Sequence, residues 1–441
     1  MSRTLRFALG LCLLLGLLLP LSNVSGAAVS LTPPPAWYEP SPFPSNCTKG
    51  LDANKSEMLF CKPSAPVGSF FYANLVIFAH GYVNPYFPAK KLPWDQLIFT
   101  APDGSKITSY DMVTKLGYYF ASTSYRANGL VVQDAIQDLL LARKWAVSKI
   151  GFRLLGVNVI LAGVSEGGLI TTLSVERYAS SYAGGLAMCG PVGDFKGQIN
   201  YWGDFRTLYD AFYNPFTPSY GGSAISIPDK LITSWYSRLE PATLSALKTQ
   251  VLAQAALDPA KTMRLLDATT APYVAADPTS MAATISGLLD YNIFATNNGQ
   301  SVLGGNPYGN ATTSYSVLSS DLVAPIQRYT ASASALTNLA KYETTGKLSK
   351  PLVLLHNQGD PIVPYWHTSK YAAKVVAGSK FSVQTAAAYY GHCNFSESDI
   401  MTAFNQLGSY VSGATLAAAQ KLPADQREAL MKQMRDEGTL K

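Results

Sequence analysis

The strongest constraint on the fold is a short stretch at residues 163–168, with the sequence GVSEGG, between two apolar segments. The apolar residues 157–162 before it suit a buried strand, and residues 169–173 after it suit a helix. A sharp reversal from strand to helix strains its central residue and leaves no room for bulk two places before and after it. The sequence therefore predicts a strand, a tight turn and a helix, with the hydroxyl of Ser165 and the N–H of Glu166 exposed at the top of a sheet.

Apolar runs alternate with helical patterns on both sides of this turn. Residues 131–147 carry apolar side chains on one helical face, whereas the short apolar runs resemble buried parallel strands. Such alternation predicts an α/β fold, with a mostly parallel sheet covered by helices on both faces. The other expected strands are residues 74–79, 118–122, 185–189, 352–355 and 381–384, and the other expected core helix is 397–411.

The alternation stops between about residues 194 and 349, where helical stretches and loops rich in Gly, Asn and Tyr replace it. With 441 residues, 48% of them hydrophobic, the chain can form one large domain with an insertion, or two domains. We interpret this segment as a helical cap. Its expected helices are roughly 229–256, 259–267, 279–289 and 321–342. The expected organisation is a signal peptide (1–27), an irregular segment (28–66), a core in two parts (67–193 and 350–414) around the cap (194–349), and a helical tail (415–441).

The N-terminus has the pattern of a secretory signal peptide. Arg3 and Arg6 precede an apolar stretch at 7–21, and small residues at 25–27 suit a cleavage site. Because this stretch is short and contains Pro20, no stable membrane anchor is expected. We expect a secreted protein, or a periplasmic one if the source is bacterial. The net charge of +6 is not concentrated in a basic run, so no nucleic-acid partner is expected.

Four cysteines remain after removal of the expected signal peptide. An even number in an exported chain favours disulfides, although free buried thiols are the alternative. Cys47 and Cys61 would close a short loop in a segment with little core of its own, and Cys189 and Cys393 are the remaining pair. No Cys or His spacing suits zinc, so neither a metal nor a cofactor is expected.

Ser165 is a candidate nucleophile. The alternative is that it belongs to a tight turn without a catalytic role. A serine hydroxyl needs a base within hydrogen-bond reach, and the base needs a carboxylate to orient it. Of the four histidines, His392 follows the last expected strand on a loop and is the candidate base. The best candidate acid is Asp360, on a Gly- and Pro-rich turn after the preceding strand; a turn-forming aspartate is the alternative.

The other histidines suit different roles. His80 and His356 each end an apolar strand and can be structural, and His367 at a helix start is expected to be solvated. The carboxyl ends of parallel strands face a common crevice. Ser165, Asp360 and His392 are therefore expected to meet there.

With its order of Ser165, Asp360 and His392, the chain resembles a secreted serine esterase or lipase of the α/β-hydrolase superfamily. The matching motifs are the turn at 80–82, the turn at 163–167, the Asp360 turn and Gly391-His392. The resemblance implies that the backbone N–H of Tyr82 joins that of Glu166 in an oxyanion hole, with a turn used only for packing as the alternative. It also implies hydrolysis of a small-molecule or lipid-like ester through an acyl-enzyme. A serine peptidase, an acyltransferase and a non-catalytic binding module are the alternatives.

Aromatic residues gather in the first part of the cap. They suit either a pocket for an apolar or aromatic ester or the packing of the cap onto the core. Arg126, after an expected strand, can line the same cleft or brace a carboxylate. The aromatic residues are Tyr201, Trp202, Tyr209, Phe212, Tyr213, Phe216, Tyr220, Trp235 and Tyr236.

Overall fold

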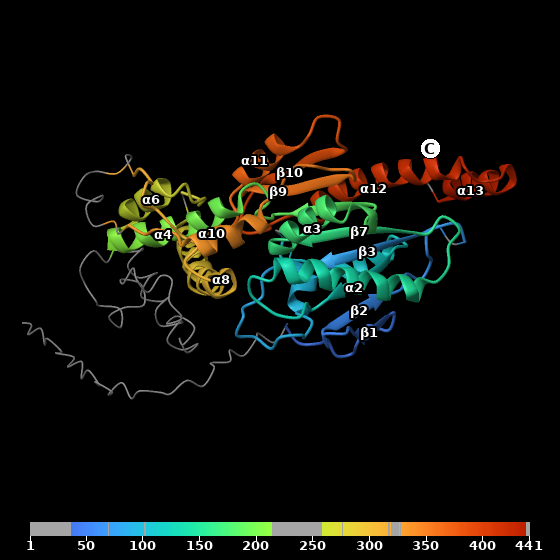
Figure 1. Ribbon diagram of the computed structural model, residues 1–441, viewed down its shortest axis with the longest axis horizontal. Coiled ribbons are helices and arrows are strands. Elements are labelled where there is room, and N and C mark those ends of the chain that lie inside the picture. Colours follow the sequence, from blue (N-terminus) through green and yellow to red (C-terminus); the bar gives the residue numbers. More distant parts are fainter. Residues whose placement is uncertain are drawn as a thin grey trace, which may run out of the picture.

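An eight-stranded sheet forms the centre of the molecule (Figure 1). The computed structural model describes residues 37–68, 70–100, 103–213, 258–275, 277–315, 318, 326 and 328–437. The expected signal peptide (1–27), the expected helix 229–256 and the aromatic residues Phe216, Tyr220, Trp235 and Tyr236 lie outside these residues.

The strand order in the sheet is β1-β2-β6-β3-β7-β8-β9-β10. Every neighbouring pair from β6 to β10 is parallel, whereas β2 runs antiparallel to both β1 and β6. The mostly parallel sheet is therefore confirmed. The strands are β1 (Cys47–Leu51), β2 (Glu57–Cys61), β3 (Ala73–Ala79), β6 (Tyr119–Thr123), β7 (Val157–Val164), β8 (Gly184–Met188), β9 (Leu352–Gly359) and β10 (Phe381–Tyr390). A separate hairpin pairs β4 (Ile98–Thr100) with β5 (Lys106–Thr108).

Helices cover both faces of the sheet, because successive strand side chains point to opposite sides. From β3, Leu75 and Ile77 pack with α2 (Val132–Ile150) and α3 (Glu166–Arg177). Val76 and Phe78 pack instead with α1 (Ser109–Lys115) and α12 (Glu397–Ala419). Nearly continuous apolar runs in the central strands follow from this double burial. The helix α11 (Trp366–Lys374) packs through Tyr371 against Leu352 and Leu354, and α13 (Ala424–Asp436) follows α12.

A group of helices gathers beyond one end of the sheet, and α12 and α13 extend past the other end (Figure 1). The group contains α4 (Phe195–Tyr213), α6 (Pro259–Ala268), α7 (Pro278–Tyr291), α8 (Asn297–Leu303) and α10 (Ala333–Leu339). The predictions for α6 and α7 are confirmed. The predicted helix 321–342 is wrong over residues 328–332, and α4 and α8 are not in the sequence-based prediction.

The predicted irregular segment 28–66 is wrong for β1 and β2, which form an antiparallel pair at the sheet edge. Cys47 lies opposite Cys61 in this pair, and a disulfide joins them. This link fixes the register of two strands that have little local sequence signal.

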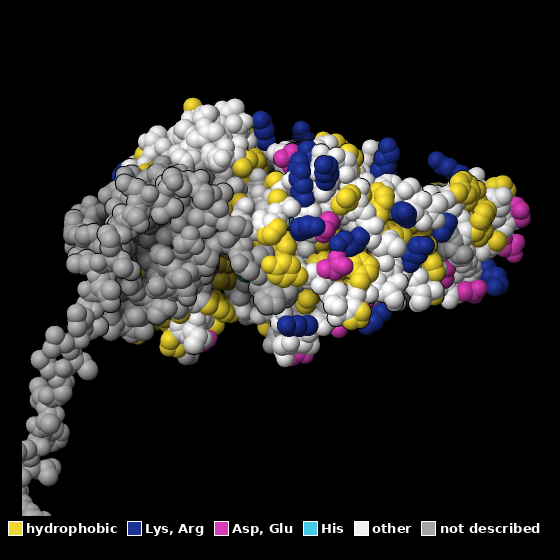
Figure 2. Space-filling view, turned by 90° about the horizontal axis from the view of Figure 1, so that it is seen from below, with side chains coloured by type: hydrophobic (Ala, Val, Ile, Leu, Met, Phe, Trp, Pro, Cys, Tyr) yellow, Lys and Arg dark blue, Asp and Glu magenta, His cyan; other side chains and the backbone are white. Residues whose placement is uncertain are grey.

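The surface shown in Figure 2 carries Lys and Arg side chains interspersed with Asp, Glu and apolar residues. Within the described part of the chain, none of the helices combines the length and the apolar character that a membrane crossing requires.

Candidate active site

Ser165 lies at a strained turn between β7 and α3, with φ of 55° and ψ of −123°. The neighbouring glycines explain how the turn fits. A Cβ atom on Gly163 would lie 2.2 Å from the carbonyl oxygen of Gly167, and one on Gly167 would lie 2.0 Å from that of Ala79. Both contacts are far below van der Waals distance, so the close approach of these backbones requires glycine at both positions.

The structure brings Ser165, His392 and Asp360 into one hydrogen-bonded chain. The Nε2 atom of His392 lies 2.8 Å from Oγ of Ser165, and its Nδ1 atom lies 2.8 Å from Oδ2 of Asp360. Asp360 follows β9, and His392 follows β10. With the proton on Nδ1 directed at the carboxylate, Nε2 can accept the Ser165 proton.

Asp360 is fully buried and well supplied with hydrogen-bond donors. Its Oδ1 accepts from the N–H groups of Ile362 and Val363 at 2.9 and 3.0 Å. Burial alone would raise the pKa of this carboxyl group. The positive charge and hydrogen bonds of His392 and His356 outweigh burial, so its pKa lies well below the usual range. Asp360 is therefore a carboxylate at neutral pH.

The loop that carries His392 is tied to the sheet at two points. A disulfide joins Cys393 to Cys189, directly after β8. The side-chain amide of Asn357, on β9, donates to the carbonyl oxygen of Gly391 at 2.8 Å. Both expected cysteine pairs are thus disulfide-bonded in the structure, and Cys393 is not a free thiol.

The residues expected to form the oxyanion hole lie beside Ser165. Tyr82 and Glu166 line the same pocket as Ser165. Gly81 is close enough that a Cβ atom on it would lie 3.2 Å from Cβ of Ser165. The turn that contains Tyr82 therefore packs directly against the Ser165 turn.

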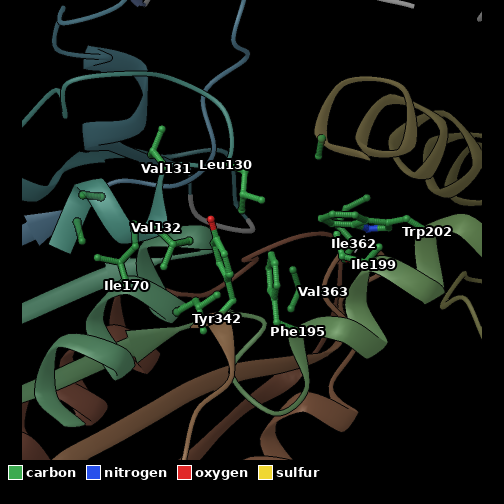
Figure 3. Packing of buried hydrophobic residues seen from close by; sticks show 14 of the residues in the cluster. Leu130, Val131, Val132, Ile170, Phe195, Ile199, Trp202, Tyr342, Ile362 and Val363 are labelled. Atoms are coloured by element: carbon green, nitrogen blue, oxygen red, sulfur yellow. Dashed lines mark hydrogen bonds between the residues drawn. The ribbon is translucent and has the colours of Figure 1, made fainter. Parts of the chain in front are cut away.

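An apolar pocket opens beside Ser165. Phe195, Ile199 and Trp202, at positions i, i+4 and i+7 of α4, border it from the cap side, and Figure 3 shows Phe195 close to Val363. The centre of a water-sized molecule can move through about 30 Å³ of this pocket. A cavity needs roughly 10–15 Å³ in this measure to hold one water, so only a small group fits. Its lining residues are Tyr82, Leu130, Ser165, Glu166, Pro191, Phe195, Ile199, Trp202, Tyr291, Ala295 and Val363.

Tyr291, at the end of α7, is a site residue that sequence analysis missed. It lines the same pocket as Ser165, whose side chain interacts with its hydroxyl group, and its ring lies 6.3 Å from that of His392, edge to face. No motif surrounds Tyr291, and the chain contains 26 tyrosines. Only the packing of the cap on the core distinguishes it.

The three remaining histidines have structural partners. His80 stacks on Tyr125 at 4.0 Å, and burial lowers its pKa to about 4. His356 contacts the carbonyl oxygen of Val363 at 2.8 Å. The expectation that His367 is solvated is wrong: it is buried, and its Nε2 lies 2.7 Å from Oε1 of Gln198 on α4.

Two other expectations are settled by contacts. Arg126 braces a carboxylate, because its guanidinium lies 2.6 and 2.9 Å from Oδ1 of the buried Asp138. Of the cap aromatics on α4, Trp202 lines the pocket. Tyr201, Tyr209 and Phe212 are buried in the core cluster.

Because Glu166 is buried, we predict that the stability of the protein depends on pH. Burial raises its pKa to about 8, from 4.5 in the absence of structure, against the opposing effect of the Val131 N–H. Between these values the folded chain binds one more proton than the unfolded chain, so the free energy of unfolding falls as pH rises from about 4.5 to about 8. Glu166→Gln removes this loss. Its melting temperature should exceed that of the wild type by more at pH 8 than at pH 5.

The matched control for this measurement is Glu428→Gln, on the surface of α13, which should change the melting temperature little at either pH. An equal difference between Glu166→Gln and wild type at both pH values would contradict the assignment of a protonated Glu166.

No family model and no curated protein matches the chain. Among solved structures, the esterase Pf2001 of Pyrococcus furiosus is 12% identical, with 83% of this chain and 89% of that chain covered and a TM-score of 0.40. The acylaminoacyl peptidase of Pyrococcus horikoshii is 13% identical, with 82% and 40% covered and a TM-score of 0.34. The dipeptidyl peptidase 4 of Porphyromonas gingivalis is 11% identical, with 83% and 35% covered and a TM-score of 0.37. The chain thus spans 40% and 35% of the length of the two peptidases.

The fold is identified from the topology of the chain itself. The central strands are parallel, β2 is antiparallel, and β3 lies between β6 and β7. A Gly-x-Ser-x-Gly turn joins β7 to α3, Asp360 follows β9 and His392 follows β10, which gives the order Ser, Asp, His. With its mostly parallel sheet, flanking helices and helical insertion, the chain has the fold of the α/β-hydrolase superfamily.

Proposed function

We propose that this protein is a serine hydrolase that cleaves carboxylic esters through an acyl-enzyme on Ser165. The observation that carries the proposal is the hydrogen-bonded chain from Oγ of Ser165 through His392 to the buried Asp360, at an apolar pocket. A serine hydroxyl becomes a useful nucleophile only when a base can take its proton, and this arrangement supplies that base.

The proposed reaction has two halves. His392 takes the proton of Ser165 as Oγ attacks the ester carbonyl, and the backbone N–H groups of Tyr82 and Glu166 stabilise the oxyanion. The tetrahedral intermediate collapses, and His392 gives the proton to the departing alcohol. A water molecule then attacks the acyl-enzyme, with His392 again as the base, and releases the acid and Ser165.

The size and lining of the pocket favour an ester with a short apolar acyl group as the substrate. Its walls are mainly carbon, from residues such as Leu130, Ile199 and Val363. Burial keeps Glu166 protonated at neutral pH, so no full charge is offered to the acyl group. A pocket with about 30 Å³ open to the centre of a water-sized molecule accommodates an acetyl or propionyl chain better than a long one.

We also propose that the protein works outside the reducing cytosol. Two disulfides among the described residues, together with the signal-like N-terminus, support export.

The test is a panel of p-nitrophenyl esters with acyl chains of two to eight carbons, run beside p-nitroanilides of the same acids. We expect the highest kcat/KM for the shortest esters and little cleavage of the anilides. A fluorophosphonate probe, with the labelled peptide identified by mass spectrometry, should modify Ser165. Preferred cleavage of the anilides would favour a serine peptidase. No labelling and no turnover would favour a binding module.

A further inference from the structure

The hydroxyl group of Tyr291 reaches the nucleophile from the cap. Tyr291 is the last residue of α7, yet its hydroxyl interacts with the side chain of Ser165, more than a hundred positions earlier in the chain. It also lines the apolar pocket. The sequence-based assignment of the site, by contrast, draws all of its residues from the core.

Neighbouring rings hold Tyr291 in this place. Its ring stacks on Trp202 at 5.2 Å with an interplanar angle of 25°, and lies 5.8 Å from the ring of Tyr82. Trp202 is itself fixed, because its Nε1 donates to the carbonyl oxygen of Ile362 at 3.2 Å. Figure 3 shows Trp202 beside Ile199 and Ile362, where α4 meets the turn after β9. The hydroxyl is therefore aimed by packing rather than by a flexible loop.

The chemistry of the contact makes Tyr291 a donor. Burial, followed by the negative charge of Asp360, raises the pKa of Tyr291 well above its usual value, so its hydroxyl keeps its proton. Oγ of Ser165 is left as an acceptor for Tyr291 when its own proton points to Nε2 of His392. A donor that reaches Oγ is also within reach of an oxygen on the carbon that becomes bonded to Oγ.

We propose that Tyr291 is a catalytic residue whose hydroxyl donates to Oγ of Ser165 at rest and to the substrate oxyanion in the tetrahedral intermediate. This inference rests on the proposed esterase function. The proton stays on Tyr291 throughout, and no bond to it forms or breaks. The cap then supplies a third donor beside the N–H groups of Tyr82 and Glu166, so that the oxyanion hole is complete only with α7 in place.

The test is Tyr291→Phe, which keeps the ring and its stacking on Trp202. Loss of one oxyanion donor lowers kcat by about a hundredfold or more, so we expect a fall of that order with p-nitrophenyl acetate. KM should change little. The rate of labelling by a fluorophosphonate should fall in parallel, because its phosphoryl oxygen occupies the same place. The melting temperature should stay near that of the wild type.

Esters with different leaving groups distinguish the proposed role of Tyr291 from a role in protonating the departing alcohol. A donor to the oxyanion matters equally for aryl and alkyl esters, so the loss in Tyr291→Phe should be the same for p-nitrophenyl acetate and ethyl acetate. A loss confined to ethyl acetate would overturn the oxyanion role. The matched control is Tyr273→Phe. Tyr273 lies in the cap but does not line the pocket, and its hydroxyl donates to Oδ1 of Asp267 at 3.0 Å. This variant should leave kcat unchanged.

Two outcomes separate this inference from the proposed function. If Ser165→Ala is inactive and Tyr291→Phe keeps wild-type kcat, the role of Tyr291 is wrong and the esterase proposal stands. If Ser165→Ala keeps wild-type activity, the proposed function itself fails.

Discussion

Ser165→Ala should lower kcat for p-nitrophenyl acetate by about a millionfold, because no acyl-enzyme can form without Oγ. The residual rate would come from binding and the oxyanion donors alone. Fold stability should be nearly unaffected, because alanine fits wherever serine fits and the strained turn depends on the flanking glycines. The measurement is steady-state hydrolysis together with a thermal melt.

Ser174→Ala is the matched control for this variant. Ser174 is also buried, further along α3, and lies away from the pocket. It should retain wild-type turnover. Activity of Ser165→Ala within tenfold of the wild type would contradict the acyl-enzyme mechanism.

Asp360→Asn should lower kcat by about ten-thousandfold at neutral pH. The carboxylate accepts the Nδ1 proton of His392, and this sets the tautomer in which Nε2 is free to act as the base. An amide can keep the hydrogen bonds from the N–H groups of Ile362 and Val363, so the turn should stay folded. The charge, the tautomer and the weaker hydrogen bond from the N–H of Cys393 to Oδ2 at 3.3 Å are lost.

A carboxylate with a purely structural role provides the comparison. Asp399 completes a capping box with Ser396 at the start of α12. Asp399→Asn should lower the melting temperature with little effect on kcat. If Asp360→Asn instead lost stability while keeping kcat, Asp360 would be a turn-forming residue and not the partner of the base.

Much of the core was predictable because the secondary structure that its local sequence favours is also the one that its burial in the fold requires. In β3 and β7, apolar side chains on both faces signal a strand buried under two layers of helices. The Ser165 turn was predictable for a different reason. Its glycines are required by backbone contacts near 2 Å, and no other residue satisfies them.

The cap was less predictable, because its helices depend on packing rather than on intrinsic propensity. The helix α4 contains Gly197 and Gly203 and many aromatic residues, all poor helix formers. It is stabilised where Trp202 and Phe205 meet the core cluster. His367 shows the same limitation, since its burial depends on Gln198, a residue 169 positions away.

At the site, sequence order alone indicated Ser165, Asp360 and His392, because the ends of neighbouring parallel strands lie together. Nothing comparable marks Tyr291. Its position depends on how α7 packs on α4, and that contact has no signature in the linear sequence.

The pairing of β8 with β9 has a consequence for how such a protein can change during evolution. Oγ1 of Thr344, shortly before β9, donates to the carbonyl oxygen of Val192, shortly after β8, at 2.6 Å, although most of the helical insertion separates the two residues in the chain. The insertion therefore leaves and rejoins the core at adjacent points. Apart from Tyr291, its length and sequence can be exchanged without moving Ser165 or His392, so selectivity for new substrates can arise in the insertion while the nucleophile, the base and Asp360 are inherited in the core.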